Sequence, residues 1–265
     1  MASPLSISEF QKTVWQYYRT SRRSMPWRGQ PAPYQVVVSE VMLQQTQVAR
    51  VLQKYPQFIA AFPDFNRLAE AQTTDLLAVW QGMGYNRRVL NLRKLAQIVI
   101  QDYGGQLPGD SAELILFPGI GPGTAGSIAA FAFNRPVVFI ETNIRRVFIH
   151  HFFADAECIS DHDLRPLVEA ALDKADPRAW YYALMDYGTY LAKAVPNPNR
   201  RSRHYVRQSK FEGSDRQIRG QIIRFLLEFP VLTAQDIVHR FPGEPPERVT
   251  KLLAQLTKEG FLQQR

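Results

Sequence analysis

Residues 110–147 read DSAELILFPGIGPGTAGSIAAFAFNRPVVFIETNIRRV, and this stretch predicts helices on both sides of a glycine-rich hairpin. Asp110 and Glu113 have the three-residue spacing of a capping box ahead of an apolar run. Pro122 fits the first position of the next helix, where a backbone N–H would be unpaired in any case. We therefore expect a helix-hairpin-helix unit, followed by one acidic residue, Glu141, just before another helix begins.

The hairpin predicts a binding site for phosphate. We expect its glycines to supply the positive φ angles that the chain reversal needs; they are Gly119, Gly121 and Gly123. Their backbone N–H groups would point outward at the positive end of a helix, where an anionic phosphate can bind without a charged side chain.

Length and composition indicate a basic protein with almost no cysteine. The chain has 265 residues, enough for one sizeable core or for two to three small domains. Its single cysteine, Cys158, excludes an internal disulfide and a multi-cysteine metal cluster, so we expect no metal. The net charge of +8 favours an acidic partner such as nucleic acid, although a solvated basic surface would give the same excess.

No apolar run approaches the ~20 residues that span a bilayer. No cationic leader precedes an apolar stretch either. We therefore expect a cytoplasmic protein without a membrane partner, associated with the nucleoid if its partner is DNA.

Apolar residues recur at helical spacing along most of the chain, and no interval shows the alternation that predicts strands. The sequence therefore predicts an all-α fold. The expected helices cover residues 6–22, 34–55, 67–72, 74–81, 87–103, 111–117, 124–133, 143–153, 161–175, 178–192, 216–228, 233–240 and 246–260.

Residues 193–216 interrupt the helical pattern. They read KAVPNPNRRSRHYVRQSKFEGSDR, which is either an ordered basic loop or a linker. Three short helices follow, and then an extended piece at Phe261 and Leu262. These elements predict a small winged-helix-like module that docks on DNA or protein, or else a helical cap on the main domain.

Two glutamates occur where their surroundings predict opposite behaviour. Glu40 lies in an apolar helix, where desolvation would raise its pKa and make it a proton donor near neutral pH; most helix glutamates, however, face water. Glu141 precedes Thr142, a good N-cap, so the positive helix end favours its ionised form; a capping acid without a substrate role is the alternative. Together they would form the acid-and-anion pair that breaks glycosidic bonds.

Several motifs make the chain resemble the helix-hairpin-helix DNA glycosylases, and within them the adenine DNA glycosylase (MutY) branch. The most specific is SEVMLQQTQV at residues 39–48, whereas the glycine hairpin marks the wider superfamily. The resemblance covers residues 25–191. Its other pieces are PWR at 26–28, WQGMGY at 80–85, NL at 91–92, PGIG at 118–121, TAG at 124–126, Asn143 with Arg146 and Val147, and MDYG at 185–188.

The resemblance implies a two-lobed glycosylase fold. Residues 30–140 would form a six-helix barrel lobe with the hairpin, residues 1–29 and 141–210 a second helical lobe, and residues 215–265 the C-terminal module. The partner would be double-stranded DNA with a mispaired or damaged base, bound by a monomer. Because the sugar carbon of the target nucleotide is inaccessible within the duplex, that nucleotide must be rotated out of the stack.

The resemblance also implies roles for three residues in catalysis. Glu40 would protonate a ring nitrogen of the extruded purine and so make it a neutral leaving group. Glu141 would stabilise the oxocarbenium-like sugar, with Asn143 as a neighbouring hydrogen-bond partner, before water completes the hydrolysis.

Further residues match positions that contact DNA in the family. Gln44, Gln45 and Tyr85 would fill or wedge the vacated stack; the alternatives are ordinary helix polarity for the glutamines and core packing for the tyrosine. The hairpin would hold a phosphate of the damaged strand, and its carbonyls are a candidate site for a monovalent cation. The arginines that would track other phosphates are Arg200, Arg201, Arg203 and Arg207.

Three features depart from the family pattern. Glu141 replaces the usual aspartate, and its extra methylene moves the carboxylate by about an ångström, so either the backbone adjusts or the substrate differs. Gly123 replaces the lysine of strand-cutting members, which predicts a monofunctional enzyme with little lyase activity. The four cysteines that hold an iron–sulfur centre in relatives are missing, so we expect no such cluster and no other cofactor.

The resemblance therefore implies a monofunctional DNA glycosylase without a cluster, which removes a mispaired base in base excision repair. Adenine is the favoured base, because Glu40 suits a purine with a protonatable nitrogen. The alternatives are a glycosylase for thymine or uracil opposite guanine, one for a deaminated purine, and a protein that binds distorted DNA without chemistry. Residues 215–265 differ from the mixed domain with which fuller members recognise 8-oxoguanine, so that recognition is not implied.

Overall fold

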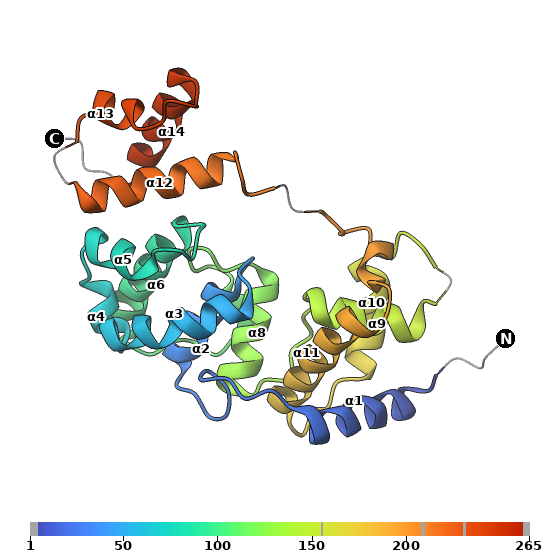
Figure 1. The fold of residues 1–265 in the computed structure, drawn as a ribbon. Helices are drawn as coiled ribbons and strands as arrows, with labels where there is room; N and C mark the ends of the chain where they lie inside the picture. The colour runs from blue at the N-terminus through green and yellow to red at the C-terminus, as the bar shows by residue number, and fades with distance from the viewer. Residues whose placement is uncertain (1–4, 155, 208–209, 230–231, 262–265) are drawn as a thin grey trace. The chain divides into compact units, whose positions relative to one another are not determined.

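A computed structural model describes residues 5–154, 156–207, 210–229 and 232–261. Helices joined by loops make up this part of the chain, which contains no strand beyond an isolated parallel bridge between Ile159 and Ser202 (Figure 1). The all-α prediction is confirmed. Of the helices in these ranges, none is long and apolar enough to cross a membrane.

Packing divides the chain into two compact units. The first unit is formed by Met1–Glu40 and Leu107–Arg207, and the second unit by Val41–Gln106 and Gln208–Arg265. The division expected from the sequence had three parts, with residues 215–265 as a separate module. Packing alone does not show which segments fold as independent domains, so the three-part division stays a prediction.

The first unit is built around an aromatic core. Phe10 contacts Phe148 and Trp180, with ring centroids 4.9 and 6.1 Å away, and all three side chains are fully buried. Burying side chains of this size stabilises a fold by about 1.5–3 kcal/mol each. The helices of this unit are α1 (Ile7–Ser21), most of α2 (Pro33–Leu43), α7 (Ser111–Leu114), α8 (Pro122–Phe133), α9 (Thr142–Phe152), α10 (Asp161–Ala170), α11 (Pro177–Ala194) and the 3-10 helix η1 (Pro198–Arg201).

In the second unit, short helices pack around the fully buried Trp80, whose ring lies 5.7 Å from that of Phe58. The helix α12 packs against α5 and α14, and α13 packs against α14. Phe261, where an extended end was predicted to begin, is buried at a bend, and Leu262 lies outside the described residues, so the extended end stays a prediction. The helices of this unit are α3 (Val48–Ala61), α4 (Phe65–Ala69), α5 (Thr73–Trp80), α6 (Arg87–Tyr103), α12 (Asp215–Glu228), α13 (Ala234–His239) and α14 (Pro246–Lys258).

The helix-hairpin-helix unit consists of α7, the turn after it, and α8. Asp110 caps α7 by accepting a hydrogen bond from the backbone N–H of Ala112, without the predicted capping box to Glu113, and Pro122 is the first residue of α8. Gly126 lets α8 approach the segment that follows it, since a Cβ at this position would lie 2.5 Å from the Cβ of Phe139. The hairpin therefore joins directly to the chain that leads to Glu141.

The predicted helix over residues 34–55 is wrong in its extent, because α2 ends at Leu43 and α3 begins at Val48. Gln45, between them, has a φ of 53°, a left-handed conformation that no α-helix accommodates. The four polar residues 44–47, QQTQ, interrupt the apolar spacing at the break, a local signal that the prediction of one long helix passed over. The break places Gln44 and Gln45 on a turn.

The basic segment after α11 is an ordered loop over residues 195–207. Asn199 is buried, and its Nδ2 donates a hydrogen bond to the Thr142 carbonyl at 2.9 Å. The backbone N–H of Ile159 donates to the Arg201 carbonyl at 3.0 Å, and the N–H of Arg203 donates to the Ile159 carbonyl at 2.9 Å. Of the two alternatives for this segment, the ordered loop is therefore the correct one up to residue 207; residues 208–209 lie outside the described residues.

Candidate active site

Glu40 lies on α2, and a hydroxyl group from another helix holds its carboxylate. The Oγ of Ser127 on α8 is 2.6 Å from Glu40 Oε2, although the two residues are 87 positions apart in the sequence. Burial raises the pKa of Glu40 to about 7; the Ser127 hydrogen bond opposes this rise, the charge of Glu141 adds to it and Arg28 opposes it. A carboxyl group that keeps its proton up to about pH 7 has the property that a general acid needs.

Glu141 is itself the N-cap of α9, one residue earlier than the predicted cap at Thr142. Its Oε1 accepts hydrogen bonds from the backbone N–H groups of Asn143 and Ile144, at 2.7 and 2.8 Å. Its Oε2 accepts one from the Asn143 side-chain amide at 3.2 Å. Three N–H donors aimed at one carboxyl group form an arrangement suited to its ionised form.

The pKa of Glu141 nevertheless moves in the direction opposite to the predicted one. Burial raises the pKa, and the backbone N–H groups of Asn143 and Ile144 lower it without outweighing burial. The helix end that was predicted to favour the ionised form is therefore outweighed by desolvation of this half-buried side chain.

Asn143 is fixed from its other side by a buried arginine. Arg146 Nη1 donates to Asn143 Oδ1 at 2.7 Å and to the Gly188 carbonyl at 2.9 Å. A Cβ at Gly188 would lie 2.6 Å from the Asn143 carbonyl oxygen, so glycine is needed for this approach of α11 to α9. The Asn143 amide therefore has one orientation, with its Nδ2 toward Glu141.

The first unit thus contains all three residues predicted to act in catalysis. Glu40 and Glu141 are close enough for the charge of one to act on the pKa of the other, yet their partners differ. The Glu40 carboxyl group contacts the Ser127 hydroxyl group. The Glu141 carboxyl group accepts hydrogen bonds from three N–H groups, two of the backbone and one of the Asn143 side chain. Such a pair can protonate a leaving group and stabilise a cation.

Of the three hairpin glycines, Gly119 has the predicted positive φ, at 78°. Gly121 is the N-cap of α8 with a φ of −93°, and Gly123 lies in the first turn of α8, so the predicted positive φ is wrong at these two. No side chain of the described ranges caps α8, and its first N–H groups lie at a positive helix end. A Cβ at Gly123 would meet the Ile140 carbonyl at an ordinary 3.8 Å, so space does not require glycine there.

In the second unit, the residues predicted to enter the DNA stack lie on two turns. Gln45 and Tyr85 have φ angles of 53° and 47°, which residues other than glycine rarely adopt. Gln45 is exposed and Gln44 half-buried, and the Tyr85 side chain is 37% exposed, so it does not belong to the core. Arg216 of α12 donates to the Tyr85 hydroxyl at 2.8 Å.

A buried arginine that sequence analysis missed, Arg88, joins these two turns. Burial lowers its pKa to about 10, so it stays cationic at neutral pH. Apart from its place three residues after Tyr85, nothing in the sequence singles it out. Its Nη1 and Nη2 donate over 2.7–3.1 Å to oxygens of both turns: the carbonyls of Val41, Met42, Gln44, Met83 and Gly84, and Thr46 Oγ1.

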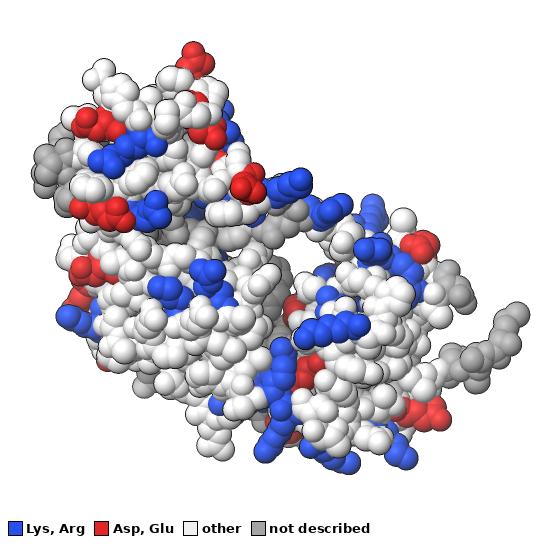
Figure 2. Space-filling model, viewed as in Figure 1, with Lys and Arg blue, Asp and Glu red and all other residues white. Residues whose placement is uncertain are grey.

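The four loop arginines divide into two kinds. Arg200, Arg203 and Arg207 are exposed, as the predicted phosphate contacts must be. Arg201 is half-buried and donates to the carbonyls of Phe153 and Ala154, so it serves the end of α9 instead. Figure 2 shows Lys and Arg side chains spread over the viewed face, interspersed with Asp and Glu.

The PWR and MDYG motifs meet in a buried ion pair whose members sequence analysis did not assign to the site. Arg28 donates to both carboxylate oxygens of Asp186, at 2.8 and 2.9 Å, and Arg23 Nε donates to one at 2.6 Å. Burial raises the pKa of Asp186, but the hydrogen bonds and charges of Arg28 and Arg23 outweigh it and keep that pKa low. The Arg28 guanidinium also lies over the Tyr182 ring, 4.5 Å from its centroid.

In the described part of the chain, no group of three or more His, Cys, Asp or Glu side chains could hold a metal ion.

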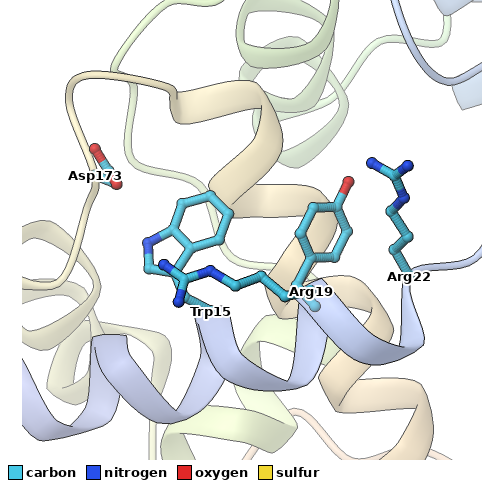
Figure 3. Close-up of a pocket in the computed structure, with 5 residues that line it drawn as sticks. Trp15, Arg19, Arg22 and Asp173 are labelled. Atoms are coloured by element: carbon cyan, nitrogen blue, oxygen red, sulfur yellow. The ribbon is translucent and has the colours of Figure 1, made fainter.

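A surface pocket of the first unit is lined by residues of α1 and of the segment after α10. Figure 3 shows this pocket, which is lined by Trp15, Tyr18, Arg19, Arg22 and Asp173. Because no predicted site residue lines it, the carboxylate pair, and not this pocket, defines the candidate active site.

The helical fold and the hairpin agree with the comparison with protein families. Residues 38–171 match the HhH-GPD superfamily base excision DNA repair protein family. The chain belongs to this superfamily.

Named relatives make the family assignment narrower. The chain is 32% identical over 263 residues to the adenine DNA glycosylase of Mycobacterium tuberculosis (strain CDC 1551 / Oshkosh), with 89% of this chain and 84% of the relative covered. It is 32% identical to that of Mycolicibacterium smegmatis, with 98% and 94% covered. This protein is a base excision repair DNA glycosylase similar to the MutY branch, and thus an enzyme that acts on N-glycosyl bonds. The relatives therefore favour an enzyme over a protein that binds DNA without chemistry.

Solved structures support the fold. A thermostable thymine-DNA glycosylase superposes with a TM-score of 0.61 at 24% identity, with 69% of this chain and 85% of that chain covered. A non-covalent endonuclease III–DNA complex gives a TM-score of 0.61 at 19% identity, with 72% and 89% covered. The helix-hairpin-helix glycosylase fold is therefore confirmed.

Proposed function

We propose that this glycosylase is monofunctional and excises adenine from a mispair in duplex DNA. The observation that carries the proposal is the pairing of Glu40, whose pKa is about 7, with Glu141, which three N–H donors surround. An acid of this strength can protonate a purine nitrogen near neutral pH. The relatives named adenine DNA glycosylase support adenine as the base.

The reaction begins when the target nucleotide leaves the stack. Glu40 transfers its proton to a ring nitrogen of the purine, and the electron pair of the C1′–N bond moves to the base, which departs neutral. Glu141 stabilises the positive charge that develops on the sugar, while Asn143 holds the Glu141 carboxylate in place. A water molecule then adds to C1′ and releases a proton, which leaves an abasic site.

The additional methylene of Glu141 is compatible with this role. The carboxylate folds back onto the first N–H groups of its own helix, where Asn143 and Ile144 bind Oε1. These hydrogen bonds limit the conformational freedom of the longer side chain. A carboxylate that moved freely would be less often in the position that catalysis needs. The backbone adjustment considered for this position is therefore the preferred alternative.

The same proposal includes no lyase step, no iron–sulfur cluster and no other cofactor, apart from a monovalent cation at the hairpin carbonyls. Gly123 offers no amine for a Schiff base, and the chain has one cysteine where a cluster needs four ligands. Borohydride treatment during turnover should trap no protein–DNA adduct. Iron analysis of the purified protein should find less than about one iron atom per chain. A stoichiometric iron–sulfur cluster would overturn the proposal that the enzyme has none.

In the proposed complex, the first N–H groups of α8 bind a phosphate of the damaged strand. Gln44, Gln45 and Tyr85 fill the space that the extruded nucleotide leaves, and the exposed loop arginines bind flanking phosphates. The enzyme acts as a monomer in the cytoplasm, on nucleoid DNA.

A panel of labelled duplexes tests the choice of base. The members carry adenine opposite 8-oxoguanine or guanine, thymine or uracil opposite guanine, and hypoxanthine, and alkali reveals each abasic site. Adenine should be released at least tenfold faster than the other bases. Faster release of thymine or uracil would establish the pyrimidine alternative, and faster release of hypoxanthine the deaminated-purine alternative.

A further inference from the structure

The hydroxyl group of Ser127 stands between two oxygen acceptors inside the first unit. Its Oγ is 2.6 Å from Glu40 Oε2 and 2.9 Å from the carbonyl oxygen of Thr124. The Ser127 side chain is buried, with 4% of its surface exposed. A serine hydroxyl has one proton and two lone pairs, so it can donate to one of these oxygens at a time.

Both distances can be satisfied together in one protonation state of Glu40. When Glu40 carries its proton on Oε2, the carboxyl O–H donates to Ser127 Oγ, and the Ser127 hydroxyl donates to the Thr124 carbonyl. When Glu40 is ionised, its carboxylate is an acceptor only, and the Ser127 hydroxyl must turn toward it. The Thr124 carbonyl then loses this donor and the carboxylate gains one.

We propose that Ser127 is a positioning residue for the glycosidic reaction. As the carboxyl proton on Glu40 Oε2 leaves its hydrogen bond to Ser127 Oγ and passes to the ring nitrogen of the base, the Ser127 hydroxyl proton turns from the Thr124 carbonyl to Oε2. This inference rests on the proposed role of Glu40 as proton donor. The rotation breaks no covalent bond and needs no other reactant. It supplies a hydrogen bond to the anion at the moment when the anion forms.

The rotation opposes the effect of burial on Glu40. A hydrogen bond to a charged acceptor is stronger than one between neutral groups, so the ionised state gains more from Ser127 than the protonated state does. The groups that act on Glu40 from the surrounding elements are Arg28 before α2, Glu141 at the start of α9 and Tyr182 on α11. On α8, Ser127 forms a hydrogen bond with the carboxyl group.

Ser127→Ala tests the proposal, because alanine keeps the helix and removes the hydroxyl. The measurement is the single-turnover rate of base release from pH 5 to 9 on the best duplex of the panel. Without the donor, the pKa of Glu40 should rise, and the decline in rate at high pH should move upward by about one pH unit. The plateau rate at low pH should fall about three- to tenfold, because Glu40 becomes a weaker acid.

Ser39→Ala is the matched control. Ser39 is also buried on α2, and its Oγ donates to the Val36 carbonyl at 2.9 Å rather than to Glu40. This variant should keep the pH profile of the unchanged protein. Ser127→Cys provides a second probe at the site itself, because a thiol is a weaker donor of similar size, and it should shift the profile in the same direction by a smaller amount.

The possible outcomes separate this inference from the function on which it rests. If Glu40→Gln is inactive and Ser127→Ala has an unshifted pH profile, the positioning role is wrong and the catalytic assignment stands. If Glu40→Gln retains the full rate, the catalytic assignment itself is wrong. A Ser127→Ala profile that shifts upward with a lower plateau, beside an unshifted Ser39→Ala profile, supports the proposal.

Discussion

Glu40 and Glu141 in the first unit are half-buried carboxyl groups held by hydrogen bonds, whereas Gln45 and Tyr85 in the second unit lie on turns that expose them. Glu40 lies within α2 and Glu141 is the N-cap of α9, and burial raises the pKa of both. The turn residues have left-handed backbones. The two glutamates are unusual in their raised pKa values, and the two turn residues are unusual in their positive φ angles.

The difference matches the two tasks proposed for these residues. Charge stabilisation is strongest where water is excluded and donors are already oriented, as they are around Glu141. A residue that enters a DNA stack must instead project from the surface and stay rigid. Unusual backbone conformations cost about 1–3 kcal/mol each, and the hydrogen bonds that Arg88 donates to both turns offset that cost.

The largest effect on the rate of base release should follow the removal of either carboxylate. Glu40→Gln and Glu141→Gln should each lower the single-turnover rate about 1,000-fold, because glutamine keeps the shape but cannot donate or carry the required charge. Duplex binding, measured by fluorescence anisotropy, should change less than about threefold. The exposed Glu169→Gln on α10 is the control, and a retained rate in either test variant would contradict its assignment.

The turns should respond most strongly to the loss of Arg88. Arg88→Met should reduce the free energy of unfolding by about 3 kcal/mol, because it leaves buried carbonyls without a donor. Its neighbour Arg87 is largely exposed and pairs with Glu259, so Arg87→Met should cost below about 1 kcal/mol. Urea unfolding measures both, and equal losses would show that Arg88 does not hold the turns.

The raised pKa of Glu40 should also make the stability of the protein depend on pH. Burial raises the pKa of Glu40 from 4.5 to about 7, so the folded state binds a proton that the unfolded state has lost, and stability falls as pH rises between these values. Glu40→Gln should therefore be about 2 kcal/mol more stable than the unchanged protein at pH 8, after allowance for partial exposure. At pH 4 this gain in stability should vanish. An equal gain at pH 4 and pH 8 would contradict the raised pKa of Glu40.

A smaller effect is expected from the exposed tyrosine. Tyr85→Ala should slow base release about tenfold, since stacking of a base on an aromatic ring contributes about 1–3 kcal/mol. Fluorescence of 2-aminopurine beside the target base reports extrusion directly. Tyr85→Phe should keep nearly the full rate, because the hydrogen bond from Arg216 lies at the exposed surface; a large loss in this variant would instead assign a role to α12.

The loop arginines should show the smallest effects. Arg203→Ala and Arg207→Ala should each weaken duplex binding about threefold and reduce the slope of log affinity against log salt by about 1. Arg201→Ala should lower the thermal midpoint, because Arg201 donates to carbonyls at the end of α9. A salt slope that changes with Arg201 and not with the other two would reverse this assignment.

The sequence by itself determined the all-α fold, the hairpin and the identity of the two carboxylates. Helical spacing and a helix-starting proline are local properties, so they can be recognised without knowing how helices pack. Asp110 and Pro122 lie at the starts of α7 and α8, as their residue types predict. The motif around Glu40 was specific enough to indicate the glycosylase family.

The tertiary structure alone decided how those residues behave. Ser127 reaches Glu40 across 87 residues, Arg88 joins two turns, and Arg201 supports a helix end rather than facing solvent. The upward shift of the Glu141 pKa likewise comes from burial in the folded chain. Periodicity shows which face of a helix is apolar, but burial and hydrogen-bond partners depend on which helices meet, and packing decides that only when the chain folds.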